Sequence, residues 1–351
     1  MRPNRSRRRG NIALAAAVMA LALSAMLGQS TTAAADPVSD MMAAARPSAD
    51  GSKLADVKPE GGNRYTLQVY SAAMDRNIEV HTIRPANTSA PRPVLYLLNG
   101  AGGGVDTRTW EERTDLVQFM ADKNVNVVIP VGGQFSYYTD WLQNDPMLGR
   151  NKWTTFLTEE LPPVINSAFA TTGVNAIAGL SMAGSAVLAL AEAAPDLYKA
   201  VGSYSGCAET STPLGQQFVK LVVESRGGGK VANMWGPSNS PDWAANDAYK
   251  NAEKLRGKAL YIASGTGLPG PNDTLTSPGV NGNPIVLADQ LMTGGVIEAA
   301  VNMCTHNLAN RLNQLQIPAT FDFTPTGTHS WGYWQDDLHN SWPMIAKAIG
   351  A

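Results

Sequence analysis

One segment of the sequence could carry a nucleophilic serine. A predicted strand at 176–179 leads into Gly179-Leu180-Ser181-Met182-Ala183, and a predicted helix follows at 185–194. This order is typical of a nucleophile elbow, in which a sharp turn projects a serine hydroxyl from the end of a strand. The fifth position holds alanine instead of glycine, and this side chain is still small. The helix directs free backbone N–H groups toward Ser181, where they favour developing negative charge.

A serine hydroxyl at its ordinary pKa is a weak nucleophile, so Ser181 needs a base. Of the four histidines, His329 lies just beyond the last predicted strand, where a fold with such an elbow places its base. His81 falls within a strand pattern and His306 within a helical one, so structural roles are expected for both. His339 is expected on a surface helix. The sequence therefore predicts His329 as the general base.

The acid that orients the base should lie between Ser181 and His329 in the chain. Asp273 follows the predicted strand at 259–263, where the common hydrolase geometry favours it. Glu298 is a lone acid in an apolar stretch, as a buried orienting carboxylate would be. The residues alone leave these two alternatives open.

A glycine-rich loop supplies the other half of an oxyanion hole. The strand at 94–98 runs into the loop at 99–104, where missing side chains allow close backbone approach. The N–H groups of Met182 and Ala101 are the predicted pair. The loop lacks the spacing of a nucleotide-phosphate site, and the His and Cys positions lack metal-ligand spacing. No cofactor and no metal are implied.

The elements that must position these residues form an α/β pattern. Most of the predicted strands are continuously apolar and are separated by helical segments, which indicates an α/β-hydrolase fold with a mostly parallel sheet. The irregular stretch 207–257 fits either an insertion over the site or a helical crossover with loops. We expect a flexible lead-in at 36–60 and one catalytic domain at 61–351. The eight predicted strands are 65–70, 78–83, 94–98, 125–130, 176–179, 200–204, 259–263 and 319–323.

The N-terminus has the pattern of an export signal. Five arginines and no acid occur in the first 35 residues, an apolar run follows at 12–27, and Ala33-Ala34-Ala35 precedes Asp36. The run is shorter than the ~20 residues of a spanning helix, so 1–35 is predicted to be a cleaved signal peptide. The rest of the chain is acidic, which argues against a nucleic-acid partner. In an oxidising compartment, Cys207 and Cys304 are expected to form a disulfide.

Several blocks in order resemble the secreted mycolyltransferases, the antigen 85 family of mycobacteria and their corynebacterial relatives. The resemblance covers nearly the whole chain after the signal peptide. The length and the loop at 99–104 look more like the corynebacterial branch, whose acyl chains are shorter. The blocks are Leu67-Gln68-Val69, Met74-Asp75-Arg76-Asn77-Ile78, Pro130-Val131-Gly132-Gly133-Gln134, Tyr138-Thr139-Asp140-Trp141, Lys152-Trp153, Phe156 to Pro162, Gly179 to Gly184, Met234-Trp235-Gly236-Pro237-Ser238 and Gly327-Thr328-His329-Ser330-Trp331.

The resemblance implies roles for particular residues. It places the acid on Glu298, which favours Glu298 over Asp273. The family holds trehalose with an Asp and an Arg whose positions fall here on Asn99 and Gly102, so the sugar site departs from the family pattern. Asn99 and Trp331 are the predicted sugar-binding residues. Arg108 or Arg113 would replace the missing arginine.

The resemblance also implies a reaction. Ser181 would take a mycolyl group from trehalose monomycolate and pass it to a hydroxyl of trehalose, cell-wall arabinan or a protein serine, at the outer mycolate layer of the envelope. A secreted carboxylesterase is the nearest alternative, because one triad serves both reactions. A surface binding or adhesion protein on a hydrolase scaffold is a further alternative. Monomer is the default oligomeric state.

Overall fold

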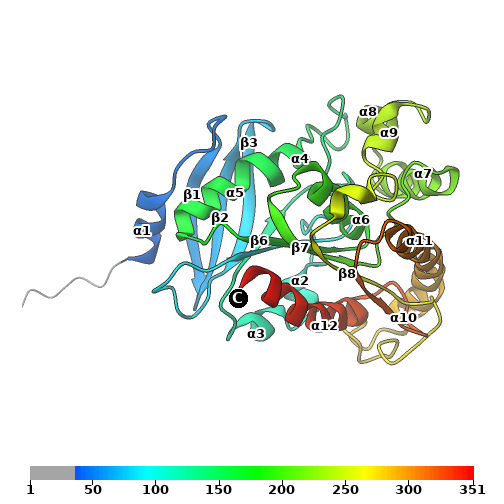
Figure 1. Ribbon diagram of the computed structural model, residues 1–351. Helices are drawn as coiled ribbons and strands as arrows, with labels where there is room; N and C mark the ends of the chain where they lie inside the picture. Colours follow the sequence, from blue (N-terminus) through cyan, green and yellow to red (C-terminus); the bar gives the residue numbers. More distant parts are fainter. Residues whose placement is uncertain (1–35) are drawn as a thin grey trace, which may run out of the picture. The chain divides into compact units, whose positions relative to one another are not determined.

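A nine-stranded sheet forms the centre of the computed structural model, which describes residues 36–351 (Figure 1). The sheet order is β1-β2-β3-β5-β4-β6-β7-β8-β9. The strands from β1 to β3 pair antiparallel, β3 pairs antiparallel with β5, and the remaining neighbours are parallel. The strands are β1 (Lys53–Gly61), β2 (Arg64–Ser71), β3 (Arg76–Ile83), β4 (Val94–Leu98), β5 (Asn126–Val131), β6 (Asn175–Leu180), β7 (Tyr198–Tyr204), β8 (Ala259–Ser264) and β9 (Thr320–Phe323).

All eight predicted strands are present, and the ninth corrects the sequence analysis. Strand β1 lies at 53–61, inside the segment expected to be a flexible lead-in, and pairs with β2 along its length. Helix α1 (Pro37–Ala44) precedes it. The expectation of a flexible segment at 36–60 is therefore wrong for most of that range. The predicted signal peptide at 1–35 lies outside the described residues.

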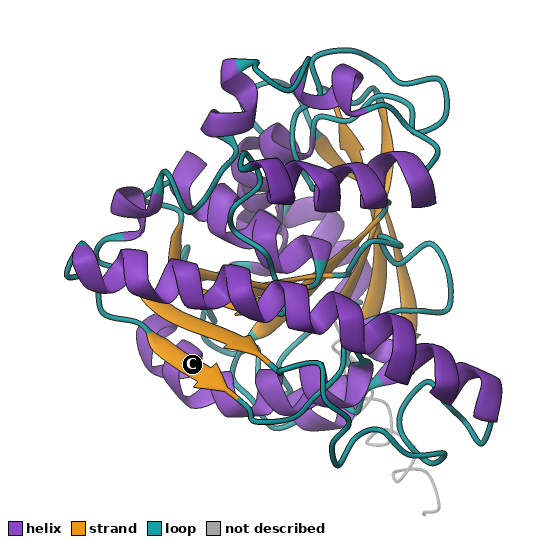
Figure 2. Ribbon diagram, turned by 90° about the vertical axis from the view of Figure 1, so that its right-hand side faces the viewer, coloured by secondary structure: helices purple, strands orange, loops and turns teal. Residues whose placement is uncertain are grey.

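Helices cover both faces of the sheet (Figures 1 and 2). On one face, α5, α6 and α11 pack through residues such as Val164, Val187 and Leu308. On the other, α3 and α12 pack through Leu116 and Leu338. The helices that follow α1 are α2 (Trp110–Arg113), α3 (Leu116–Met120), α4 (Trp153–Thr155), η1 (Phe156–Glu160), α5 (Leu161–Phe169), α6 (Met182–Ala193), α7 (Pro213–Lys220), η2 (Leu221–Arg226), α8 (Val231–Trp235), α9 (Pro241–Ala245), η3 (Ala252–Leu255), α10 (Pro284–Asp289), η4 (Gln290–Gly294), α11 (Gly295–Gln314) and α12 (Trp331–Ile349).

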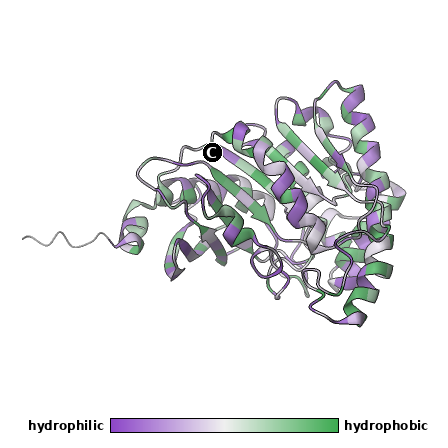
Figure 3. Ribbon diagram, turned by 90° about the horizontal axis from the view of Figure 1, so that it is seen from below, coloured by the Kyte–Doolittle hydropathy of each residue, from purple (hydrophilic) through white to green (hydrophobic). Residues whose placement is uncertain are grey.

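Burial follows the sequence patterns. Every residue of β4 and β6 is buried, as expected for central parallel strands covered on both faces. Figure 3 shows hydrophobic colour concentrated along the strands, whereas the helices mix both kinds of residue. The fold is therefore a three-layer α/β-hydrolase fold, and the parallel strands end where β4 and β6 lead into the glycine loop and Ser181.

Two further segments bear on the site. The stretch 207–257 is a helical crossover between β7 and β8 that contains α7, η2, α8, α9 and η3. Residues Pro284–Gln314 form a run of helix that is long and apolar enough to cross a membrane by length and composition alone. Its Leu308 and Leu312 belong to the main core, while Ile285 and Met292 are exposed. Within this fold the run is thus a partly exposed helix that packs on the sheet.

Candidate active site

The elbow around Ser181 has the strained backbone that its sequence predicts. Ser181 lies between β6 and α6 with φ 58° and ψ −124°, a conformation that L-residues rarely adopt. Its N–H donates to the Tyr204 carbonyl at 2.8 Å. A β-carbon at Gly179 would lie 2.9 Å from Cβ of Ala183, and one at Gly184 would lie 2.7 Å from the Tyr204 carbonyl oxygen. Both glycines are required because the turn brings α6 this close to the strands.

Three predicted residues from separate elements form one hydrogen-bonded chain. The Oγ atom of Ser181 lies 2.7 Å from Nε2 of His329, and Nδ1 of His329 lies 2.7 Å from Oε2 of Glu298. His329 comes from the loop after β9, and Glu298 from the first turn of α11. Ser181 is half-buried, the His329 side chain is 10% exposed and the Glu298 side chain 1%, so burial increases from the serine to the acid.

The second carboxylate oxygen of Glu298 is held by groups that sequence reasoning missed. Oε1 accepts a hydrogen bond from Oγ of Ser205 at 2.8 Å and another from the N–H of Gly265 at 2.9 Å. The indole N–H of Trp334 donates to Ser205 Oγ at 3.0 Å. These donors fix the carboxylate in position. The only sequence signal was that Ser205 and Gly265 each follow the end of a predicted strand.

The structure separates Asp273 from the base. Its carboxylate accepts hydrogen bonds from the hydroxyls of Thr328 and Tyr333 and from the side-chain amide of Gln290. Those contacts anchor the loop after β8 to the loop that carries His329. Glu298, not Asp273, lies against His329, so the alternative based on common hydrolase geometry is wrong here.

A second acid, Asp337, is buried close to Glu298. Burial raises the pKa of Asp337 well above its usual value, and the nearby charge of Glu298 raises it further. The raised pKa favours the protonated form of Asp337. Glu298 is the acid in hydrogen-bond contact with His329, where it can stabilise an imidazolium that forms during the reaction.

The glycine loop lies directly against the elbow. A β-carbon at Gly100 would be 3.5 Å from Cβ of Ser181 and 2.7 Å from Cδ1 of Leu180, so only glycine fits. Ala101 is the next residue, and its carbonyl is held by the N–H of Phe135 at 2.8 Å. Met182 begins α6. Of the two predicted oxyanion residues, Met182 thus follows Ser181 directly at the start of α6, and Ala101 lies in the glycine loop that contacts the elbow through Gly100.

The predicted sugar-site residues differ in their surroundings. Asn99 is fully buried, its Oδ1 accepts from the N–H of Trp110 at 3.1 Å, and its Nδ2 has no partner among residues 36–351. Trp331 begins α12 and packs edge to face with Trp110 at 5.8 Å. The side chain of Arg108 is 67% exposed and lies 4.0 Å from Asp106. The substrate roles of Asn99, Trp331 and Arg108 stay predictions.

Of the two candidate arginines, Arg113 is linked to the surroundings of Trp331 through Gly279. Its Nη1 donates to the Gly279 carbonyl at 3.4 Å. A β-carbon at Gly279 would lie 3.4 Å from that Nη1 and 3.6 Å from Cδ1 of Trp331. The described contacts of Arg108 are with Asp106, so the substrate role of either arginine stays a prediction.

The other histidines have partners away from Ser181. His81 lies between Glu111 and Glu79, at 2.6 and 3.0 Å. His306 stacks on Phe323, and His339 contacts Asp115 at 2.9 Å. Within residues 36–351 no group of three or more His, Cys, Asp or Glu side chains could hold a metal ion.

A disulfide between Cys207 and Cys304 joins two segments that hold catalytic residues in place. Cys207 follows β7 closely after Ser205, and Cys304 lies on α11 beyond Glu298. The bond therefore ties the helix that carries the acid to the loop that holds it.

The fold and the Ser181–His329–Glu298 arrangement define a serine esterase-type enzyme of the α/β-hydrolase class. The model of the family described as putative esterase matches residues 71–345. The diacylglycerol acyltransferase/mycolyltransferase Ag85A of Mycobacterium leprae is 36% identical over 294 residues, which cover 81% of this chain and 83% of the relative. Ag85B of Mycobacterium avium is 34% identical over 293 residues, with 81% and 83% covered.

Solved structures agree with this class. Mycobacterium tuberculosis MPT51 has a TM-score of 0.68 and 26% identity, covering 82% of this chain and 100% of its own. An S-formylglutathione hydrolase of Agrobacterium tumefaciens, at TM-score 0.60 and 17% identity, covers 85% of this chain and 100% of its own and shows the fold alone. The chain belongs to the antigen 85 family of mycolyltransferases.

Proposed function

We propose that this chain transfers a (coryno)mycolyl group from trehalose monomycolate, through an acyl-enzyme on Ser181, to a hydroxyl acceptor. The observation that carries the proposal is the hydrogen-bonded chain from Ser181 Oγ through His329 to Glu298, at 2.7 Å for each contact. Membership of a family whose relatives bear the name mycolyltransferase supports the acyl group.

The first half-reaction forms the acyl-enzyme. His329 Nε2 takes the Ser181 proton as Oγ attacks the ester carbonyl, and the N–H groups of Met182 and Ala101 stabilise the oxyanion. Collapse of this intermediate breaks the bond to the sugar oxygen. His329 returns the proton to that oxygen, and free trehalose leaves.

The second half-reaction uses the same groups in reverse. An acceptor hydroxyl replaces the departed sugar, His329 removes its proton, and attack on the acyl-enzyme gives a new ester and frees Ser181. Water in place of the acceptor would give the free acid, which is the reaction of a carboxylesterase. The two functions differ in acceptor binding and water exclusion.

The acceptor is a hydroxyl of trehalose, arabinogalactan or a protein serine, and Asn99, Trp331 and an arginine would bind the sugar. Removal of residues 1–35 as a signal peptide would deliver the enzyme to the cell envelope, next to the outer mycolate layer. We propose a monomer that needs no cofactor and no nucleic acid.

Incubation of the mature protein with trehalose monocorynomycolate, with and without added trehalose, tests the proposal. Lipid products are separated by chromatography. Trehalose dicorynomycolate that is absent with Ser181→Ala is the expected result. Free acid alone, even when trehalose, arabinan and protein acceptors are all offered, would instead identify an esterase.

A further inference from the structure

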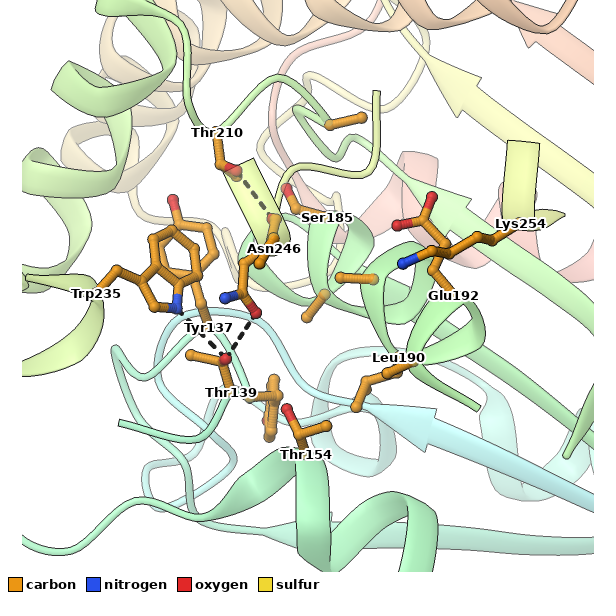
Figure 4. A pocket seen from close by; sticks show the side chains of 16 residues that line it. Tyr137, Thr139, Thr154, Ser185, Leu190, Glu192, Thr210, Trp235, Asn246 and Lys254 are labelled. Carbon is orange, nitrogen blue, oxygen red and sulfur yellow. Dashed lines mark hydrogen bonds between the residues drawn. The ribbon is translucent and has the colours of Figure 1, made fainter. Parts of the chain in front are cut away.

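A pocket lies beside α6, and its lining does not include Ser181, His329 or Glu298 (Figure 4). Its volume of about 170 Å³ is room for one small organic molecule. One face of α6 lines it, together with α8, the end of α9 and the loops that follow β5 and β7. The labelled polar side chains include Thr139, Thr154 and Ser185.

Glu192 is the residue in this pocket that the fold does not explain. It is 4% exposed, and its Oε1 atom is buried without a hydrogen-bond partner in the part of the chain that the structure describes. Burial raises the pKa of Glu192 to about 9, although the charge of Lys254 opposes this shift. At neutral pH the group is a protonated carboxyl, which offers one O–H donor and acceptor oxygens.

A buried carboxyl group without a partner lowers the stability of the fold, and a leucine of similar size would avoid that cost. A ligand in the pocket would supply the missing partner. We propose that this pocket binds a small neutral polyhydroxy compound, about one sugar ring in size, with a ligand hydroxyl on the carboxyl group of Glu192.

The lining favours this ligand class over a cation. Hydroxyls of Ser185 and Thr154 can each donate and accept, as Glu192 can, which matches the hydroxyls of a polyol. Trp235 and Tyr137, with ring centroids 5.8 Å apart, provide apolar walls for the C–H face of a sugar ring. An ammonium ligand would meet the positive charge of Lys254, which also lines the pocket.

The pocket adjoins the elbow without sharing its reactive groups. Ser185 follows Ser181 by one turn of α6, and its N–H donates to the Ser181 carbonyl at 3.4 Å. The N–H of Tyr137 contacts the sulfur of Met182 at 3.4 Å. No residue assigned to acyl transfer lines the pocket, so this inference does not rest on the proposed function.

Saturation-transfer NMR with glucose as the probe tests the assignment. We expect saturable binding to the parent protein, retained within a few-fold in Glu192→Gln, which keeps a donor and an acceptor. Glu192→Leu is expected to weaken binding by about tenfold or more, since the hydrogen bonds are lost. Glu253→Gln, which changes an exposed glutamate of η3, serves as the matched control and should not alter binding.

Three results would overturn the proposal. The first is an absence of saturable glucose binding to the parent protein. The second is equal glucose affinity in the parent and in Glu192→Leu, with circular dichroism showing that the variant is folded. The third is saturable binding of methylammonium but not of glucose, which would assign the pocket to a cation.

Discussion

Among residues 36–351, Glu298 is the one carboxylate that contacts the base, and its second oxygen accepts hydrogen bonds from Ser205 and Gly265. A buried carboxylate in this position keeps His329 in the tautomer that accepts the serine proton and stabilises the imidazolium that forms. Single substitutions should therefore show which of the two acids, Glu298 or Asp273, acts with His329. The residues alone left this question open.

Glu298→Gln is expected to lower kcat for acyl transfer by roughly 10³–10⁴-fold, because an amide of the same shape cannot compensate the imidazolium. Asp273→Asn is the matched control, and it should keep kcat within a few-fold while lowering Tm by weakening the loop after β8. Steady-state kinetics and thermal unfolding of both variants check this. Lost turnover in Asp273→Asn with retained turnover in Glu298→Gln would reverse our assignment.

His81 should make stability depend on pH. The hydrogen bond to Glu111, opposed in part by burial, raises the pKa of His81 above its ordinary value. The stabilisation is complete below the unfolded pKa of about 6.5 and is lost as the pH rises through the higher folded value. The Tm deficit of His81→Gln relative to the parent should therefore be larger at about pH 5.5 than at about pH 9. An equal deficit at both pH values would exclude this role.

At the scale of elements, the contact between α6 and the loop from β7 to α7 determines the orientation of Ser181 at the elbow. A β-carbon at Gly184 would lie 2.7 Å from the Tyr204 carbonyl oxygen and 3.0 Å from backbone atoms of Gly206. Gly184→Ala should cost about 1–3 kcal/mol of unfolding free energy and reduce activity, because α6 must shift with Ser181. Gly62→Ala, in open space in the β1–β2 turn but at φ 62°, should lower stability by its backbone strain and leave activity unchanged. Full activity in Gly184→Ala would show that the elbow tolerates the shift.

The disulfide should matter for both stability and activity. It closes a loop with a sequence separation of 97 residues and holds α11, which carries Glu298. Replacement of both Cys207 and Cys304 by serine is expected to cost about 2–5 kcal/mol in denaturant unfolding. It should also lower kcat more than KM rises, since the acid loses its fixed position. Unchanged stability in the double variant would contradict this account.

For the whole molecule, local patterns predicted the sheet except for its first edge strand. Strand β1 has only Leu54 and Val57 buried, contains Pro59, and is interrupted by a register shift between Leu54 and Asp56. An exposed edge strand with these features lacks both alternation and a continuous apolar run, so its sequence resembles a loop.

The residues of the site also differ in whether local sequence patterns predict them. Ser181 and His329 have local signals, because a turn between strand and helix and a loop after the last strand mark them. The choice between Glu298 and Asp273 depends on how α11 packs, which is a long-range property that the residues left open and the family resemblance decided. The supporting contacts of Ser205 and Gly265 come from two parallel strand ends that meet only in the folded sheet.

The central claim is that an acyl group passes through Ser181 to a hydroxyl acceptor. Intact-mass spectrometry of the mature protein after brief exposure to trehalose monocorynomycolate, followed by peptide mapping, tests it most directly. We predict one corynomycolyl adduct on the peptide that contains Ser181, discharged faster by added trehalose than by water alone. An adduct on another residue, or discharge that no hydroxyl acceptor accelerates, would contradict the account.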